Sequence, residues 1–416
     1  MTMIAILNAD SDPHLLADTL LSVHGADRRG DKEIWLPSLG VIPSEQPTTG
    51  DPWYIYRLAR KSLALPDGAG MLAYAGTGKE AAVFWAAYSE KILFAKNFDE
   101  DRRVDRALLE QCISDLHMPA NLALLGVLVD ADGKREVFRY GEVFSFVSDA
   151  YGTCYFAGSG SPYLMEKVRK ADDAQNASRG VTDVYSVTEH LAEKLSANLL
   201  VHERFTDENG QSTGALHLAA GGFLEWYAVS GEGVRPIRER MDLHFEVNPG
   251  GLFANAIYLI GSKSYIDKPA YGSIISVIKL LQQPVEGSLG IDELGGWFYQ
   301  LENLADAFGG LIEPSLHKVG QTASERGDDR LYGAATAATI KESYGDFIEI
   351  RRLRVTLSVN NQIISFGFVA PLDAEPFACV AVSEESSEVV VGDDVISTIV
   401  ERAARLDPGF AKRIGM

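Results

Sequence analysis

The sequence has no hydrophobic run that could cross a membrane, which takes about 20 consecutive apolar residues. Its first residues also lack the basic stretch and apolar segment that together mark a secretory signal. We therefore expect a soluble cytoplasmic protein with no membrane partner.

Cysteine and metal-binding histidine patterns are also lacking. The three cysteines, Cys112, Cys154 and Cys379, are far apart and odd in number, which suits reduced, buried thiols better than a disulfide framework or a zinc site. The eight histidines include no His-Glu-x-x-His or similar paired spacing. We expect no metal and no cofactor.

Positive charge is too sparse and too scattered for nucleic-acid binding. The chain has 38 Lys and Arg against 58 Asp and Glu, a formal net charge of −20, and its arginines cluster only as pairs such as Arg28-Arg29 and Arg102-Arg103. A phosphate-tracking surface needs a longer basic stripe. The segment at 73–80 resembles a phosphate loop but lacks the leading Gly and the Ser or Thr after Lys79, so nucleotide binding is not expected there either.

With 416 residues, 46% of them hydrophobic, the chain is long enough for two domains. The pattern divides it into residues 1–234, with an insert at about 23–60 that reads as an extended loop, and an accessory α+β domain of unknown role at 235–416. Packing, oligomer contact, and substrate or partner recognition all remain open roles for the second domain. Residues 327–333 in it are expected to form a mobile loop.

Hydrophobic periodicity predicts the order of elements in the first part. Strands are expected at 2–7, 14–18, 61–65, 71–75, 121–130, 136–147, 152–157 and 213–229. Helices are expected at 79–94, 101–116, 161–171 and 183–204. In the second part we expect strands at 241–248, 253–261, 346–358 and 361–370, and helices at 272–282, 292–308 and 393–406.

The N-terminal residues carry a candidate catalytic group. Thr2 becomes the first residue if Met1 is removed, and its small side chain permits that removal. A Thr hydroxyl is a poor nucleophile by itself, but an α-amino group, with a pKa of about 7.7–8.0, can accept its proton. One residue would then supply both nucleophile and base.

Four separated elements resemble the proteasome β-subunit family of N-terminal-nucleophile (Ntn) hydrolases, which includes bacterial proteasome-like peptidases. Thr2 is followed by Asp18 at the end of the second expected strand, and Lys61 opens the third. An apolar strand then ends at Gly76, and a Gly-Ser-Gly-Ser element spans 158–161. The resemblance covers about residues 2–230 and implies a four-layer αββα Ntn-hydrolase sandwich.

The resemblance also implies roles for these residues. Thr2 would be the nucleophile, Lys61 would keep the local potential positive, and Asp18 would orient Lys61. The backbone N–H of Gly76 would stabilise an oxyanion, and Ser159 would hydrogen-bond near the amine. These roles are physically coherent, because an ammonium beside a hydroxyl favours its deprotonated form.

The sequence departs from the family at three places. The interval between Asp18 and Lys61 is longer than usual, so Lys32 is a rival for the role of Lys61. The Asp and Ser that many β-subunits carry on a late strand correspond to His217 and Ala220. The strand context favours Lys61 over Lys32, whereas His217 and Ala220 leave proton handling near the amine open.

The function expected from these residues is hydrolysis of amide bonds, most readily of peptides or proteins, by a threonine protease. The alternatives are a catalytically inactive proteasome-like scaffold and a non-peptide amidohydrolase on the same fold. The resemblance further implies a homo-oligomer, through the helices at 79–94 and 101–116 or through the second domain, and an unfoldase partner.

Overall fold

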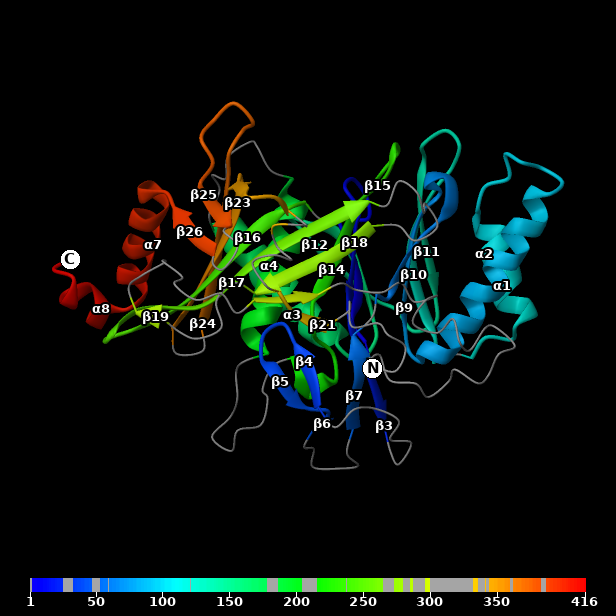
Figure 1. The fold of residues 1–416 in the computed structure, drawn as a ribbon. Coiled ribbons are helices and arrows are strands. Elements are labelled where there is room, and N and C mark those ends of the chain that lie inside the picture. The colour runs from blue at the N-terminus through cyan, green and yellow to red at the C-terminus, as the bar shows by residue number, and fades with distance from the viewer. Residues whose placement is uncertain are drawn as a thin grey trace.

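The computed structural model describes residues 2–24, 33–46, 53–58, 60–119, 121–177, 186–203, 215–236 and 238–264. Of the remainder it describes 273–279, 285–286, 296–299, 332–335, 341, 344–359, 362–382 and 387–416. The described chain is a mixture of helices and largely antiparallel sheets (Figure 1). No helix among these residues is long and apolar enough to cross a membrane.

The first sheet has six strands, all antiparallel to their neighbours. Its order is β12 (Phe144–Ser148), β13 (Gly152–Ala157), β1 (Ile4–Leu7), β2 (His14–Asp18), β14 (Leu224–Ser230) and β15 (Gly233–Pro236). The N-terminal strand β1 is therefore central, and all four of its side chains are fully buried. A central strand at the very start of the chain places Thr2 at one end of the sheet.

The second sheet packs face to face on the first. Its order is β11 (Arg135–Tyr140), β10 (Ala123–Val129), β9 (Gly70–Ala75) and β8 (Ser62–Ala64). Alternate side chains of β9 pack into two different hydrophobic cores, since side chains of a strand point to opposite faces. Met71 and Ala73 join the core shared with the first sheet, whereas Leu72 and Tyr74 face a helix pair. This alternation explains why β9 is buried on both faces.

Each sheet carries helices on its outer face. Helices α1 (Gly78–Lys96) and α2 (Arg106–Asp115) cover the second sheet through Phe84, Ile92 and Leu109. They form the outer edge of the molecule on the right of Figure 1. Helices α3 (Ser161–Ala177) and α4 (Val187–His202) contribute to the core of the first sheet instead.

The insert at about 23–60 is not the extended loop expected from its composition. Its described residues form β3 (Leu20–His24), β4 (Glu33–Leu36), β5 (Gly40–Pro43), β6 (Glu45–Gln46) and β7 (Trp53–Leu58). Strand β3 pairs with β7, and β4 pairs with β5 in a hairpin. Leu36 and Ile55 are buried in the core of the first sheet, so the insert is part of the folded body.

The second part of the chain forms a further sheet of eight strands. Its described strands are β16 (Arg240–Asn248), β17 (Gly251–Ser264), β18 (Ser273–Lys279), β19 (Val285–Glu286), β20 (Gly296–Tyr299), β21 (Tyr332–Ala335), β23 (Arg352–Val359) and β24 (Gln362–Val369). A three-stranded sheet of β22 (Phe347–Ile350), β25 (Ala378–Val382) and β26 (Ser387–Val391) lies beside it. Helices α7 (Asp393–Leu406) and α8 (Pro408–Arg413) complete this part.

Several expected elements are corrected by the structure. The helix expected at 272–282 is strand β18, and the described residues of 292–308 form strand β20. The strand expected at 136–147 is two strands, β11 and β12, and that at 213–229 begins as a 3₁₀ turn at Ala215–Leu218. Of the loop expected at 327–333, residues 332–333 belong to β21 and the others lie outside the described residues.

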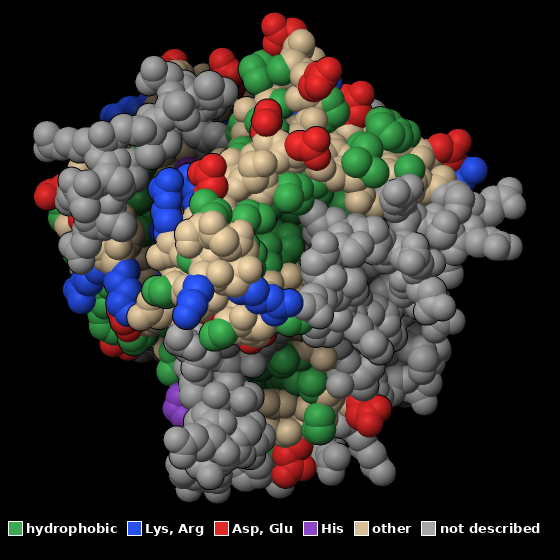
Figure 2. Space-filling view, turned by 90° about the vertical axis from the view of Figure 1, so that its left-hand side faces the viewer, with side chains coloured by type: hydrophobic (Ala, Val, Ile, Leu, Met, Phe, Trp, Pro, Cys, Tyr) green, Lys and Arg blue, Asp and Glu red, His purple; other side chains and the backbone are tan. Residues whose placement is uncertain are grey.

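Helix α7 packs through one face onto the core of the second part. Val395, Ile399 and Ala403 are buried there at helical spacing. The opposite face is solvated, and Figure 2 shows the side of the molecule that includes it, with Lys and Arg side chains across the middle and acidic side chains mainly above and below. Although the chain has a net charge of −20, its acidic side chains do not form one continuous patch on this side.

Helix α4 lies between the two parts of the chain and is buried on nearly every side. Its apolar residues, such as Leu191 and Leu195, pack on the first sheet. Glu189 and Glu193, one turn apart, face strand β23 instead. Residues four apart on a helix and two apart on a strand are separated by similar distances, about 6–7 Å, so two carboxylates can meet two strand arginines.

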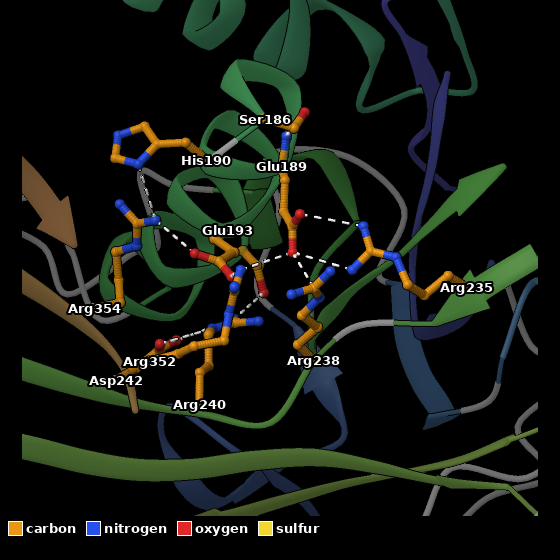
Figure 3. Close-up of polar contacts among 11 residues, drawn as sticks. Ser186, Glu189, His190, Glu193, Arg235, Arg238, Arg240, Asp242, Arg352 and Arg354 are labelled. Carbon is orange, nitrogen blue, oxygen red and sulfur yellow. Dashed lines mark hydrogen bonds and ion pairs between the residues drawn. The ribbon is translucent and has the colours of Figure 1, made fainter. Parts of the chain in front are cut away.

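Those arginines are Arg352 and Arg354 (Figure 3). Arg352 Nη2 lies 2.7 Å from Glu189 Oε1 and 2.9 Å from Glu193 Oε1, and Arg354 Nη2 lies 2.7 Å from Glu193 Oε2. Arg354 Nη2 also lies 3.3 Å from Nδ1 of His190, the residue after Glu189. The contacts join the two parts through buried charges.

More charged residues complete this cluster at its ends. Arg235 and Arg238 pair with Glu189 from the solvent side, whereas Arg240 and Asp242 form a fully buried pair on β16. Arg240 also donates to Ser196 of α4. Breaking one member of such a buried cluster leaves an uncompensated charge, which typically costs about 3–5 kcal/mol.

This cluster predicts acid sensitivity. Burial and the charge of Arg354 lower the pKa of His190 to about 3, so below pH 6.5 the unfolded chain binds a proton that the folded chain does not. Burial alone would raise the pKa of Glu193, but Arg354, Arg240 and Arg352 bring it down to about 2. Below pH 4.5 the unfolded chain therefore binds a second proton that the folded chain does not, and more folding stability is lost. The free energy of unfolding should therefore fall as the pH drops from 6.5, and more steeply below 4.5.

Glu193→Gln tests this expectation by urea unfolding between pH 3 and 7. The variant should lose about 3 kcal/mol at pH 7, because two arginines lose a buried partner, and its stability should depend less on pH below 4.5. Glu401→Gln, which changes an exposed carboxylate on α7, is the control and should behave as the wild type. An unchanged slope below pH 4.5 in Glu193→Gln would contradict the assignment.

Candidate functional site

Thr2 lies where three elements of the first sheet end together. In the register of the sheet, Ile4 of β1 is opposite both Ala17 of β2 and Ala157 of β13. One step toward the N-terminus therefore brings Met3 level with Asp18, and a second step brings Thr2 level with Ser159. The regular pairing of three short strands explains why residues so distant in sequence meet.

The Gly-Ser-Gly element wraps around Thr2. The Thr2 nitrogen donates to Ser159 Oγ at 3.2 Å, and the Gly160 nitrogen donates to the Thr2 carbonyl at 3.0 Å. Gly158 has φ +91°, and a Cβ there would lie 2.1 Å from the Thr2 carbonyl oxygen. Only glycine permits so close an approach in that conformation. The element thus fixes the position of the Thr2 backbone.

Asp18 accepts three hydrogen bonds and is fully buried. Its Oδ1 accepts from Lys61 Nζ at 2.7 Å and from the Met3 N–H at 2.9 Å, and its Oδ2 accepts from the Gly221 N–H at 3.0 Å. Three donors, one of them charged, stabilise the ionised carboxylate. Asp18 therefore ties Lys61 directly to the residue that follows Thr2.

Lys61 crosses from the second sheet to reach Asp18. It immediately precedes β8, and its side chain is fully buried. Burial lowers the pKa of the Lys61 ammonium below its usual value, and the carboxylate of Asp18 offsets part of that effect. A buried lysine with a single carboxylate partner is a frequent feature of functional sites. The rival Lys32 lies outside the described residues, as does Met1.

Gly76 directly follows strand β9, in the bend that leads to α1. It has φ +112°, and a Cβ there would lie 2.3 Å from the Asn121 carbonyl oxygen, so only glycine fits. Its neighbour Ala75 lies against Gly158, since a Cβ on Gly158 would be 3.1 Å from the Ala75 Cβ. The turn at Gly76 is therefore close to the segment that encloses Thr2.

His217 and Ala220, the two positions at which the sequence departs from the resemblance, flank a residue that contacts Ser159. His217 is exposed in the 3₁₀ turn, and Ala220 is fully buried. Ser159 Oγ donates to the carbonyl of Leu218 at 3.1 Å, so backbone rather than a side chain meets Ser159 here.

A buried polar network on the flanks of Lys61 was not anticipated from the sequence. Arg60 Nε donates to Glu225 Oε2 at 3.1 Å, and Ser62 Oγ donates to Glu225 Oε1 at 2.7 Å. Tyr227 donates its hydroxyl to Glu225 Oε2 at 2.7 Å. The residues on both sides of Lys61 thus bind one carboxylate on β14. The signal in the sequence was a single acidic residue within the apolar run Leu224-Glu225-Trp226-Tyr227.

The described residues contain no group of three or more His, Cys, Asp or Glu side chains placed to hold a metal ion. No protein-family model matches the chain, and no curated protein sequence matches it. We therefore infer the function from the geometry of the chain itself.

Proposed function

We propose that this chain is an N-terminal threonine hydrolase that cleaves amide bonds, preferentially in peptides. Thr2 would be the nucleophile, and its α-amine, freed by removal of Met1, would be the base. One observation carries the proposal: Asp18 Oδ1 accepts hydrogen bonds from both Lys61 and the N–H of Met3, next to Thr2. One carboxylate oxygen thereby links a buried ammonium to the backbone of the residue that follows Thr2.

We also propose that residues 1–234 form the αββα sandwich of the proteasome-like Ntn hydrolases. Two sheets with a shared core, each with a helix pair on its outer face, support this assignment. So does the position of Thr2 at the start of a central strand. The second part of the chain then covers α4, the helix that would otherwise present its outer face to solvent.

In the proposed reaction, Thr2 Oγ1 attacks the carbonyl carbon of the amide while its proton passes to the Thr2 amine. The backbone N–H of Gly76 donates to the oxyanion, and the Lys61 ammonium stabilises the developing negative charge. Collapse of the intermediate breaks the C–N bond, and the amine proton leaves with the departing amine. Water then attacks the resulting ester while its proton passes to the Thr2 amine. The C–O bond to Thr2 Oγ1 breaks, and the amine returns the proton to Oγ1, which restores Thr2.

Mass spectrometry after reaction with a hydroxyl-directed electrophile tests the proposal. The purified protein should have the mass of the chain without Met1 and should gain one label, mapped to Thr2. Thr2→Ala should gain none. A chain that retains Met1 and takes no label would instead support the inactive scaffold.

Burial of the site favours a second candidate, a non-peptide amidohydrolase. Thr2 is 1% exposed, and Asp18 and Lys61 are 0% exposed. A small amide fits such a site more easily than an extended peptide does. Parallel assays with unstructured peptides and with small acyl amides distinguish the two, since each candidate predicts turnover of one class only.

We further propose that the chain forms a homo-oligomer through α1. Leu93 is 66% exposed, Phe94 64% and Phe98 79%, and the rings of the two phenylalanines are 5.0 Å apart. Exposed apolar clusters of this kind mark protein–protein contacts. A second copy of the chain, as in the proteasome-like rings that the sequence resembles, is the occupant we propose.

Phe94→Glu should weaken self-association at least about tenfold, because burying a charge in an apolar contact costs more than 1.4 kcal/mol. Light scattering at micromolar concentration measures the effect. Leu372→Glu is the matched control. Leu372 is 88% exposed, belongs to the second part of the chain and not to α1, and should tolerate the change. A monomeric wild-type protein would contradict the oligomer.

A further inference from the structure

Glu203 occupies a position that is unfavourable for a carboxylate unless other segments supply hydrogen-bond donors. It directly follows α4 and is 1% exposed. The C-terminal end of a helix carries partial negative charge, so an acidic residue is normally disfavoured there. A buried carboxylate at this point must be stabilised by donors from elsewhere.

Two of its donors come from distant segments. The N–H of Gly222 donates to Glu203 Oε1, and the hydroxyl of Ser38 donates to Glu203 Oε2. Ser38 lies in the turn between β4 and β5 of the insert. A Cβ on Gly221 would lie 2.3 Å from Glu203 Oε1, so the turn is pressed directly against the carboxylate. Glu203 therefore holds the Gly221-Gly222 turn against the insert.

That turn also holds the proposed catalytic groups. The Gly221 N–H donates to Asp18 Oδ2 at 3.0 Å. The Leu218 carbonyl accepts from Ser159 Oγ at 3.1 Å, and the Phe223 N–H donates to Thr19 Oγ1 at 2.9 Å. Backbone groups of residues 218–223 thus contact Ser159, Asp18 and the residue after Asp18. Glu203 touches the same turn from behind.

We propose that Glu203 is a positioning residue, which with Ser38 fixes the 218–223 turn and so orients Asp18 and Ser159. The inference rests on the proposed function and gives the insert a part in the site. It also explains how the turn stays in place with alanine at position 220, which offers no polar group for a hydrogen bond. Glu203 touches no reacting atom and acts only through the turn.

The variants Glu203→Ala and Glu203→Gln test the role through kinetics. Glu203→Ala should lower kcat about 100-fold, because a misplaced catalytic group can cost that much, and should leave KM within about twofold. Glu203→Gln keeps one oxygen for the Gly222 N–H and should recover kcat to within about tenfold of the wild type. Ser38→Ala should lower kcat by a smaller factor of about three, since only the bond from the insert is lost.

Glu189→Gln is the control, because Glu189 is also buried but lies at the other end of α4, where it pairs with Arg235, Arg238 and Arg352. It should lower the melting temperature while keeping kcat within about twofold. The positioning role is overturned if Glu203→Ala keeps kcat within about twofold of the wild type. If that variant does not fold, unchanged kcat in both Glu203→Gln and Ser38→Ala overturns it.

Hydrogen exchange separates this inference from the proposed function. In Glu203→Ala, amides of residues 218–223 should exchange at least about tenfold faster, whereas those of β10, in the second sheet, should be unchanged. If the wild type neither turns over amides nor takes the label at Thr2, the proposed function fails and exchange alone decides the positioning role. Unchanged exchange in the turn overturns that role.

Discussion

Thr2→Ala should abolish amide hydrolysis, with a loss in kcat on the order of 10⁴-fold or more. The substitution removes the nucleophile but leaves Asp18, Lys61 and the Gly76 turn in place, so substrate binding should persist. Thr2 is buried and its backbone is held by Ser159 and Gly160, which alanine preserves. Initial rates and KM on peptide substrates, measured beside thermal unfolding, separate lost chemistry from lost folding.

Thr2→Ser is the matched variant and should keep part of the activity, since it retains both the hydroxyl and the α-amine. Molecules that still carry Met1 should be inactive, because an amide nitrogen has no basic lone pair to accept the hydroxyl proton. Equal turnover by Thr2→Ala, or by protein with Met1 demonstrably attached, would disprove the N-terminal-nucleophile mechanism.

The elements around the proposed site could be predicted because their patterns are local. The strands β1 and β2, the strand β9 that ends just before Gly76, and helix α1 are each predicted by a few residues with regular spacing. The spacing from Thr2 to Asp18 reflects one hairpin, which a sequence can specify alone. Lys61 and Ser159 were identified only through the resemblance to a family.

Two errors have physical causes. The insert looked like a loop because Gly, Pro and Thr are frequent in it, but β3 and β7 gain their stability from each other across some thirty residues. The segment at 272–282 looked helical because its apolar residues allow either period, and pairing with β17 decides for a strand. Both outcomes depend on long-range pairing that no local window contains.

The residues that support the site were harder to foresee than those in it. Glu203 and Glu225 each bind groups more than a hundred residues away, at Ser38 and at Ser62. Nothing in the spacing of the sequence relates these pairs. For Glu225 the available signal is a lone acidic residue in an apolar run, because burying it requires a partner. Glu203, between His202 and Arg204, has no such signal.

The environment of Lys61 leads to the last prediction. Lys61→Met keeps most of the side-chain volume and removes the charge, so we expect a loss in kcat on the order of 10³-fold with KM little changed. Asp18 keeps the N–H groups of Met3 and Gly221, so the variant should still fold. Glu225→Gln perturbs the network flanking Lys61 but leaves the Lys61 charge in place. It should therefore lower kcat less, by about tenfold.

The pH dependence gives an independent reading of the same residue. Burial lowers the pKa of Lys61, so wild-type kcat should fall at alkaline pH as the ammonium loses its proton earlier than a free lysine would. The free energy of unfolding should instead rise with pH between that lowered pKa and 10.5, because the unfolded chain binds more protons there than the folded one. Lys61→Met should lose both dependences. If the variant keeps the alkaline fall in kcat, another group titrates there and Lys61 does not hold the charge that the reaction needs.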